Sequence, residues 1–162
     1  MGTRSEIQKS GISQTGRRFS DDPGDRPHLK GDLAEMVAKI QKLELEVEQE
    51  KGRFSLFGLV LRAGSEQRWD LVAAADWVGS SRQAALRYLS ERVSHVLNSD
   101  ELLKISRIVP MDARDDFVEE MHKLIVVKHG LREVDDNDVA GVEVERALII
   151  TSANSGNSRV GQ

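Results

Sequence analysis

The sequence predicts an α+β fold with a mainly antiparallel sheet of about five strands, two or three helices packed on it, and an N-terminal helical arm. One observation is the order of patterns, which runs helix, strand, strand, helix, strand, helix, strand, strand. Another is that apolar residues are dense from Phe54 to Ser152 and sparse before that part of the chain. We therefore divide the chain into a disordered tail (1–31), a helical arm (32–52), an α+β domain (53–153) and a second disordered tail (154–162).

Composition and charge narrow the classes of function. The chain of 162 residues has no cysteine, which excludes disulfides, thiolate metal sites, iron–sulfur clusters and a cysteine nucleophile. Its formal net charge of -4 gives no overall positive field for nucleic acid. Its apolar runs are too short to cross a bilayer, and no apolar segment typical of a signal peptide begins it. We expect a cytoplasmic protein without membrane contact, and we predict no cofactor.

The first 31 residues have the composition of a disordered tail. They are rich in Ser, Gly, Asp and Arg, show no hydrophobic period, and cannot offset their ordering entropy by burial. Six Lys or Arg face four Asp or Glu, so this part is slightly basic. The pair Arg17-Arg18 could contact phosphate or an acidic partner, although a solvated tail is the simpler interpretation.

A helix is expected from Asp32 to about Lys51. Asp32 is a suitable N-cap, Glu35 follows three positions later, and strong helix formers come next. Apolar residues then recur at spacings of three and four and form a short coiled-coil seam: Leu33, Met36, Ile40, Leu43 and Val47. The seam spans about two and a half heptads, which is too short to decide between dimerisation and packing on the protein's own core.

A β-hairpin is expected next, with strands over 54–63 and 68–78. Asp70 and Asp76 lie in the second strand, but they are about 20 Å apart if it is regular, so they cannot share one metal ion. We expect Asp70 to mark the start of the strand and Asp76 to lie near its end, where it could cap a helix. Trp69 and Trp77 are expected in the core or at the centre of an interface.

The following helix is expected to begin at Ser80 or Ser81 and to end near residue 98. Its first turn is the candidate anion site of the sequence, because free backbone N–H groups at a helix start attract anions. The candidate residues are Gly79, Ser80, Ser81 and Arg82. A helix capped by serine looks the same without any ligand, and the lysine and second glycine of a P-loop are missing.

The remaining chain predicts a short helical piece after Ser99, a strand over 106–111, a helix over 113–124, and two last strands. Pro110 is expected at a sheet edge or at the end of a strand, and Asp112 is the expected cap of the helix. The final strands, over 125–134 and 142–152, are expected to be joined by an acidic loop.

The polar residues of this part do not form a recognisable site. The stripe Asp112, Asp115, Glu119 and His122 contains one Glu-x-x-His, whereas di-iron bundles need a second copy. Asp135 to Asp138 resemble part of a calcium loop but lack the glycine and the final glutamate of an EF-hand. His95 and His129 have no neighbours at ligand spacing, so no metal site is predicted.

No catalytic constellation emerges, and the sequence leaves open whether the protein is an enzyme. Our first hypothesis is a non-catalytic interaction or assembly module that self-associates or binds another protein, with the seam as its candidate interface. The alternative is an enzyme or a small-ligand protein with an anion or nucleotide site near Gly79 to Arg82. A third, weaker hypothesis is contact with nucleic acid through Arg17-Arg18.

Overall fold

The structure is a computed structural model that describes residues 29–154. Nearly all of the two predicted disordered tails lies outside these residues. The elements are α1 (Gly31–Lys51), β1 (Leu56–Arg62), β2 (Trp69–Ala74), α2 (Asp76–Gly79), α3 (Arg82–Val96), α4 (Ser99–Leu103), β3 (Ile105–Met111), α5 (Asp116–Leu124), β4 (Arg132–Val139) and β5 (Val142–Ser152). The α+β class of the prediction is confirmed, with five helices among the described residues.

The five strands form one sheet in the order β3-β2-β1-β5-β4. The predicted β1–β2 hairpin is confirmed, with Leu56 opposite Ala74 and Val60 opposite Asp70. β3 lies at the edge, as Pro110 predicts, but it runs parallel to β2. The sheet is therefore mixed, and the prediction of a mainly antiparallel sheet was wrong. The physical reason is that helices α2, α3 and α4 connect β2 to β3, and a helical crossover lets the next strand run parallel.

The last hairpin differs from its predicted boundaries. The acidic stretch expected as a loop belongs to strand β4, in which Asp135 pairs with Arg146 and Asp138 with Glu143. The turn consists of Ala140 and Gly141, whose φ values are 49° and 84°. Two central residues with positive φ match the twist of an antiparallel hairpin, so this short turn fixes the register and the acidic residues enter the strand.

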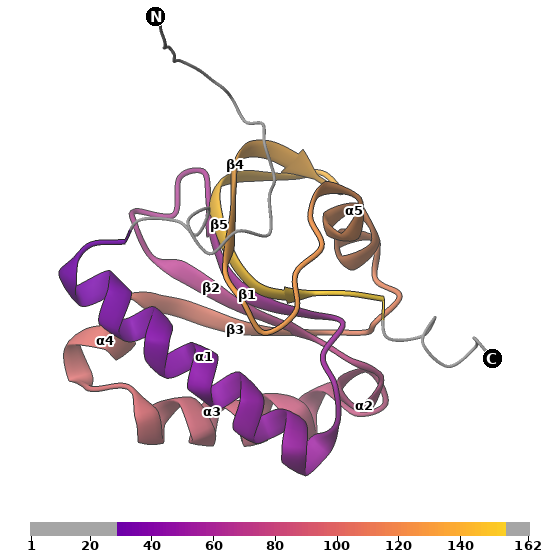
Figure 1. The fold of residues 1–162 in the computed structure, drawn as a ribbon, viewed down its shortest axis with the longest axis horizontal. Helices are drawn as coiled ribbons and strands as arrows, with labels where there is room; N and C mark the ends of the chain where they lie inside the picture. The colour runs from indigo at the N-terminus through magenta and orange to yellow at the C-terminus, as the bar shows by residue number, and fades with distance from the viewer. Residues whose placement is uncertain (1–28, 155–162) are drawn as a thin grey trace, which may run out of the picture.

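Two hydrophobic cores lie on opposite faces of the sheet (Figure 1). Helices α1 and α3 cover one face, and this core includes Ile40, Leu59, Leu71, Leu89 and Leu148. Helix α5 covers the other face together with the curled β4–β5 hairpin, and this core includes Val60, Val72, Met121, Val139 and Ile149. The sheet is thus enclosed on both sides.

Helix α1 is part of the folded layer and does not project as an arm. It buries six side chains: Met36, Val37, Ile40, Leu43, Glu44 and Val47. Ion pairs also attach it to its helical neighbours, because Arg92 of α3 contacts Glu46 at 3.1 Å and Lys39 contacts Glu101 of α4 at 2.9 Å. α1 therefore closes the first core.

Helix caps differ in detail from their predicted positions. α5 is capped by Asp115, whose carboxylate accepts from the Phe117 N–H at 2.9 Å, and not by Asp112. Ser81 precedes α3 without a capping side-chain bond, and a full capping box instead joins Asn98 and Glu101 at the start of α4. The sequence pattern places these helices within a few residues, but several side chains compete for each cap.

Candidate functional site

A pocket of about 580 Å³ lies at the end of the sheet where α1 begins, and we name it the Trp69 pocket. Its apolar lining comes from three elements: Leu33 of α1, Leu61 of β1 and Trp69 of β2. The rest of the lining is polar or charged and consists of Gln67, Lys104, Asp135, Asp136, Glu145 and Arg146. An apolar lining with a few converging charges is typical of a binding pocket.

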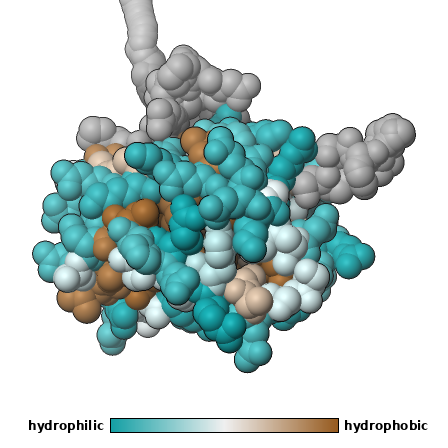
Figure 2. Space-filling view, turned by 90° about the horizontal axis from the view of Figure 1, so that it is seen from below, coloured by the Kyte–Doolittle hydropathy of each residue, from teal (hydrophilic) through white to brown (hydrophobic). Residues whose placement is uncertain are grey.

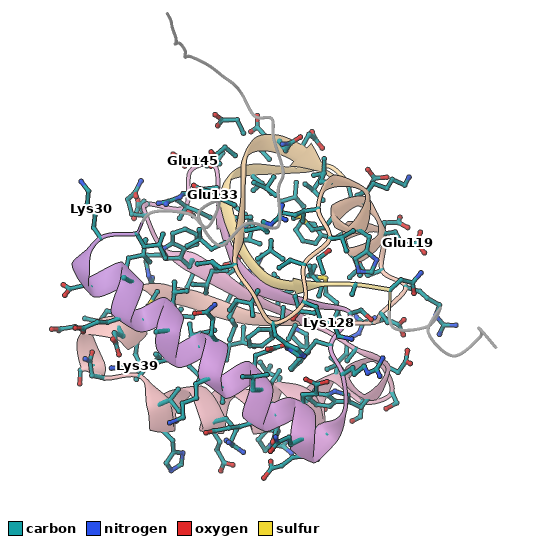
Figure 3. All side chains as sticks on the ribbon, in the orientation of Figure 1. Lys30, Lys39, Glu119, Lys128, Glu133 and Glu145 are labelled. Atoms are coloured by element: carbon teal, nitrogen blue, oxygen red, sulfur yellow. The ribbon has the colours of Figure 1, made fainter. Side chains whose placement is uncertain are left out.

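Carboxylates dominate the charge around this pocket. Figure 3 shows Glu133 and Glu145 on β4 and β5, toward the end of the molecule where Lys30 precedes α1. Partial burial and the neighbouring Glu133 carboxylate raise the pKa of Asp135 to about 6. Burial in the first place and the Glu133 carboxylate in the second oppose ionisation of Asp135, and a cation bound beside it would favour its ionised form.

Arg146 does not balance this negative charge by itself. Its Nε donates to Glu133 Oε2 at 2.5 Å, and its guanidinium carbon lies 6.0 Å from the centre of the Trp69 ring. Three carboxylates of the lining, Asp135, Asp136 and Glu145, then face Lys104 as the remaining cation. When its carboxylates are ionised, the pocket has a net negative charge above an apolar floor.

The predicted anion candidates lie on the short helix α2 and at the start of α3. Three of their backbone N–H groups already donate within the chain: Gly79 to Ala75 O, Ser80 to Asp76 O and Ser81 to Val78 O. A Cβ placed on Gly79 would lie 2.4 Å from Asp112 Oδ2, so a carboxylate fills the space beside it. Anion binding at Arg82 stays a prediction, and this geometry gives it no support.

The five seam residues have different surroundings. Four of them are buried in the chain's own first core: Met36, Ile40, Leu43 and Val47. Leu33 is half-buried and lines the Trp69 pocket. The outer side of the helical layer is mostly hydrophilic, with a hydrophobic area toward the side where α4 lies (Figure 2). The seam was compatible with dimerisation or with packing on the protein's own core, and packing on the core accounts for its four buried residues.

The two aspartates of the second strand have separate structural roles. Asp70 is 3% exposed in β2, and its Oδ2 lies 2.7 Å from Arg62 Nε and 3.3 Å from Arg107 Nε. Asp76 is the first residue of α2. Trp69 and Trp77 both pack with the first core, as residues of this size usually do.

The acidic stripe of α5 does not gather into a site either. His122 directs Nε2 to the backbone oxygen of Ser55 at 2.8 Å. Asp112 accepts from the Arg114 N–H, a contact that lowers the pKa of its carboxyl group. These residues have separate partners; Asp112 and Asp115 precede α5 and His122 is half-buried, so the predicted solvated face applies to Glu119 alone.

Among the described residues, one group could bring three metal ligands together: Glu44, Glu48 and His129. Glu44 and Glu48 are one turn apart on α1, and His129 belongs to the segment between α5 and β4. His129 Nδ1 lies 3.0 Å from Glu44 Oε1, and its Nε2 lies 3.0 Å from Glu48 Oε1. We name these three residues the His129 cluster.

Thr151 of β5 holds the buried end of the His129 cluster in place. Its hydroxyl donates to Glu44 Oε2 at 2.7 Å and accepts the His129 backbone N–H at 3.1 Å. Glu44 is 1% exposed, and an ionised carboxylate at such depth requires strong partners. His129 has a φ of 51°, a backbone conformation that few non-glycine residues adopt.

Searches of protein-family models, of curated proteins and of solved structures find no match for this chain. None of the helices in residues 29–154 combines the length and apolar character needed to cross a membrane. The function must therefore be argued from the geometry of the chain itself.

Sequence reasoning missed both groups of residues. The Trp69 pocket combines residues of α1, β1, β2, β4 and β5 together with two connecting segments, and no local motif marks it. His129 and Glu44 are 85 positions apart, so ligand spacing along the chain could not associate them. The one available signal was the pair Glu44 and Glu48, which share a helix face beside the apolar seam.

Proposed function

We propose that the protein is a non-catalytic interaction module that binds a basic segment of another protein in the Trp69 pocket. The observation that carries this proposal is the combination of an apolar floor with a negatively charged wall. The floor, made of Leu33, Leu61 and Trp69, suits an apolar side chain. The crowded carboxylates suit lysine or arginine on either side of that apolar anchor.

The charge of the wall favours a cationic partner over an anionic one. Asp135, Asp136 and Glu145 line the pocket, and the pKa of Asp135 is raised by partial burial first and by the neighbouring Glu133 carboxylate second. A bound cation stabilises all of these groups in their ionised form, whereas a phosphate would add to the repulsion. Nucleic acid is accordingly a poor ligand for this pocket.

The proposal does not include self-association through the coiled-coil seam, because four of its side chains are buried in the same chain. Leu33 is the exception, and it contributes to the pocket instead. Of the five residues predicted as an interface, only Leu33 is therefore available to a partner, and it belongs to the Trp69 pocket.

Tryptophan fluorescence provides a direct test. The chain has two tryptophans, so a Trp77→Phe variant of the full chain leaves Trp69 as the reporter. The probes are short peptides with one leucine between pairs of lysines or arginines, and matched peptides with glutamate in place of each basic residue. We expect a saturable change in Trp69 emission with the basic peptides, weakening as salt is added.

Charge variants identify the site. Asp136→Asn with Glu145→Gln should weaken binding of the basic peptide several-fold, because both carboxylates line the pocket. The matched control is Asp116→Asn with Glu119→Gln, which removes two charges from α5 outside the pocket lining. An equal response to the glutamate peptide, or binding that is unchanged in the pocket variant, would contradict the proposal.

A further inference from the structure

The His129 cluster is independent of the Trp69 pocket, because it lies on the second half of α1. Leu33 and Glu44 are separated along the helix by roughly 16 Å at the standard rise per residue. The cluster is also distinct from the anion candidates at Gly79 to Arg82. Its three side chains therefore require an explanation of their own.

The positions of the two ring nitrogens of His129 raise a chemical question. Each nitrogen lies 3.0 Å from a carboxylate oxygen, Nδ1 from Glu44 and Nε2 from Glu48. Neutral imidazole has one N–H, and ionised carboxylates can only accept. One of the two contacts therefore places a lone pair against a carboxylate unless a cation fills it. That cation is either a second proton or a metal ion.

The surroundings of Glu44 determine which nitrogen holds the N–H in a neutral ring. Thr151 donates to Oε2 of Glu44, and His129 Nδ1 lies 3.0 Å from Oε1 and 3.1 Å from Oε2 of the same carboxylate. Because Glu44 is buried and anchored in this way, it is the natural acceptor for Nδ1–H. This arrangement directs the lone pair of Nε2 toward Glu48. A carboxylate that fixes the far nitrogen of a histidine is the usual support of a metal-binding imidazole.

A small cavity of about 80 Å³ adjoins the His129 cluster, since Glu48, His129 and Thr151 all line it. Lys128 also lines this cavity, and Figure 3 shows it beside the second half of α1. A water takes about 30 Å³ in the liquid, so the cavity has room for about two waters. Two protein ligands with water at the open positions is a feasible coordination for a divalent ion.

We propose that His129 Nε2 and the Glu48 carboxylate bind a divalent transition-metal ion, with Glu44 and Thr151 as the residues that orient His129. The ligand set selects the class of metal, because imidazole suits zinc, cobalt and nickel, whereas magnesium and calcium prefer oxygen ligands alone. The 3.0 Å between Nε2 and the Glu48 oxygen is short enough for one ion to contact both at about 2.0–2.2 Å. The site joins α1 to the segment before β4.

Titration of the untagged, chelator-treated full chain with Zn²⁺ tests the proposal by calorimetry, with Co²⁺ absorption as a second readout. We expect one ion per chain, and loss of binding in His129→Gln and in Glu48→Gln. Glu44→Gln keeps both ligands but loses the charge that orients the ring, so its Kd should rise by about 10- to 100-fold. His95→Gln is the matched control, because this exposed histidine on α3 lies outside the cluster.

The spectrum of the histidine rings separates a metal site from a simple ion pair. We expect Zn²⁺ to shift the His129 Nε2 resonance in long-range ¹H–¹⁵N spectra while Nδ1 keeps its proton. If His129→Gln impairs folding, Glu48→Gln with this spectrum still provides the test, because the Glu48 side chain is 23% exposed. Absence of Zn²⁺ binding at millimolar concentration, or binding by the His129→Gln and Glu48→Gln variants as tight as that of the wild type, would overturn the proposal and leave the cluster as an ion pair without a metal.

Discussion

Two leucines on α1 provide a sharp test of how this helix is held. Leu43 is 1% exposed and belongs to the first core, whereas Leu45, two positions later, is 45% exposed. Leu43→Ala and Leu45→Ala remove the same three carbons from the same helix. Any difference in their effect on stability therefore measures burial, and not helix propensity.

The magnitudes follow from the burial of each side chain. Losing three fully buried carbons costs about 2.4 kcal/mol of transfer free energy at 0.8 per carbon. The cavity left behind raises the cost of Leu43→Ala to about 3–4 kcal/mol. For Leu45→Ala, half-exposure of the side chain reduces the transfer free energy that is lost to about 1 kcal/mol. With an m-value of about 2 kcal/mol/M in urea, Leu43→Ala should lower the midpoint by about 1.5–2 M.

Urea unfolding followed by circular dichroism, at two protein concentrations tenfold apart, is the assay. If α1 packs on its own sheet, the Leu43→Ala midpoint is the same at both concentrations. If a partner helix buries the seam instead, the midpoint of the wild type rises with concentration because association is linked to folding. Equal destabilisation by the two variants, or a midpoint that depends on concentration, would refute the packing of α1 described above.

Three further outcomes follow from individual contacts. Gly58→Ala should destabilise the protein by about 3 kcal/mol in urea unfolding, because a Cβ there would lie 2.6 Å from the Leu148 carbonyl oxygen; a cost below 1 kcal/mol would contradict that close approach. Partial burial and Glu133 raise the pKa of Asp135 from 3.8 to about 6, so the folded state binds this proton more tightly than the unfolded one and stability is lost as pH rises through about 6. Asp135→Asn should therefore gain stability relative to the wild type between about pH 4 and about pH 7, and a constant difference across unfolding curves in this range would count against the crowding. Burial alone would raise the pKa of Glu101, but the Asn98 N–H and Lys39 lower it. Glu101→Ala should therefore cost about 1–2 kcal/mol of stability at neutral pH, and less at acid pH, where the wild-type carboxylate is protonated. Thermal unfolding of both proteins at each pH measures the difference.

Local patterns predicted most elements of the fold, because the chemistry that starts and ends them is local. The β1–β2 hairpin, the helix before it and the edge position of Pro110 follow from periodicity and backbone restrictions. The prediction of a mainly antiparallel sheet was wrong, because β3 runs parallel to β2. Its parallel pairing depends on how three helices cross the sheet, and the sequence pattern of β3 itself is the same in either direction.

The end of the chain shows how a turn can override composition. The run Asp135 to Asp138 has the composition of a loop, yet it forms part of β4. The positive φ values of Ala140 and Gly141 set the hairpin register, and this register draws the acidic residues into the ladder. Consecutive charged residues are also compatible with an edge strand such as β4, because charged edges oppose pairing with other chains.

Neither candidate site could be located from the sequence. The Trp69 pocket needs Leu33 and Asp135 at one end of the sheet, and the His129 cluster needs residues 85 positions apart. Long-range packing creates both sites. The sequence shows which residue types are present, but it does not show which of them come close together in the fold. His129 falls within the expected strand over 125–134, but it lies in the segment between α5 and β4, and its two carboxylate neighbours come from α1.

The position of β5 determines when the fold can be completed during synthesis. It is the last of the five strands in chain order, yet it lies between β1 and β4. Until residues 142–152 leave the ribosome, β1 has an unpaired edge, and Leu148 and Ile150 are missing from the first core. The N-terminal elements are synthesised first, so the apolar surfaces of α1 and the β1–β2 hairpin stay exposed to solvent until the final strand pairs with β1. The nascent chain therefore exposes apolar surface until its last strand inserts, and truncation before β5 removes the strand that joins β1 to β4.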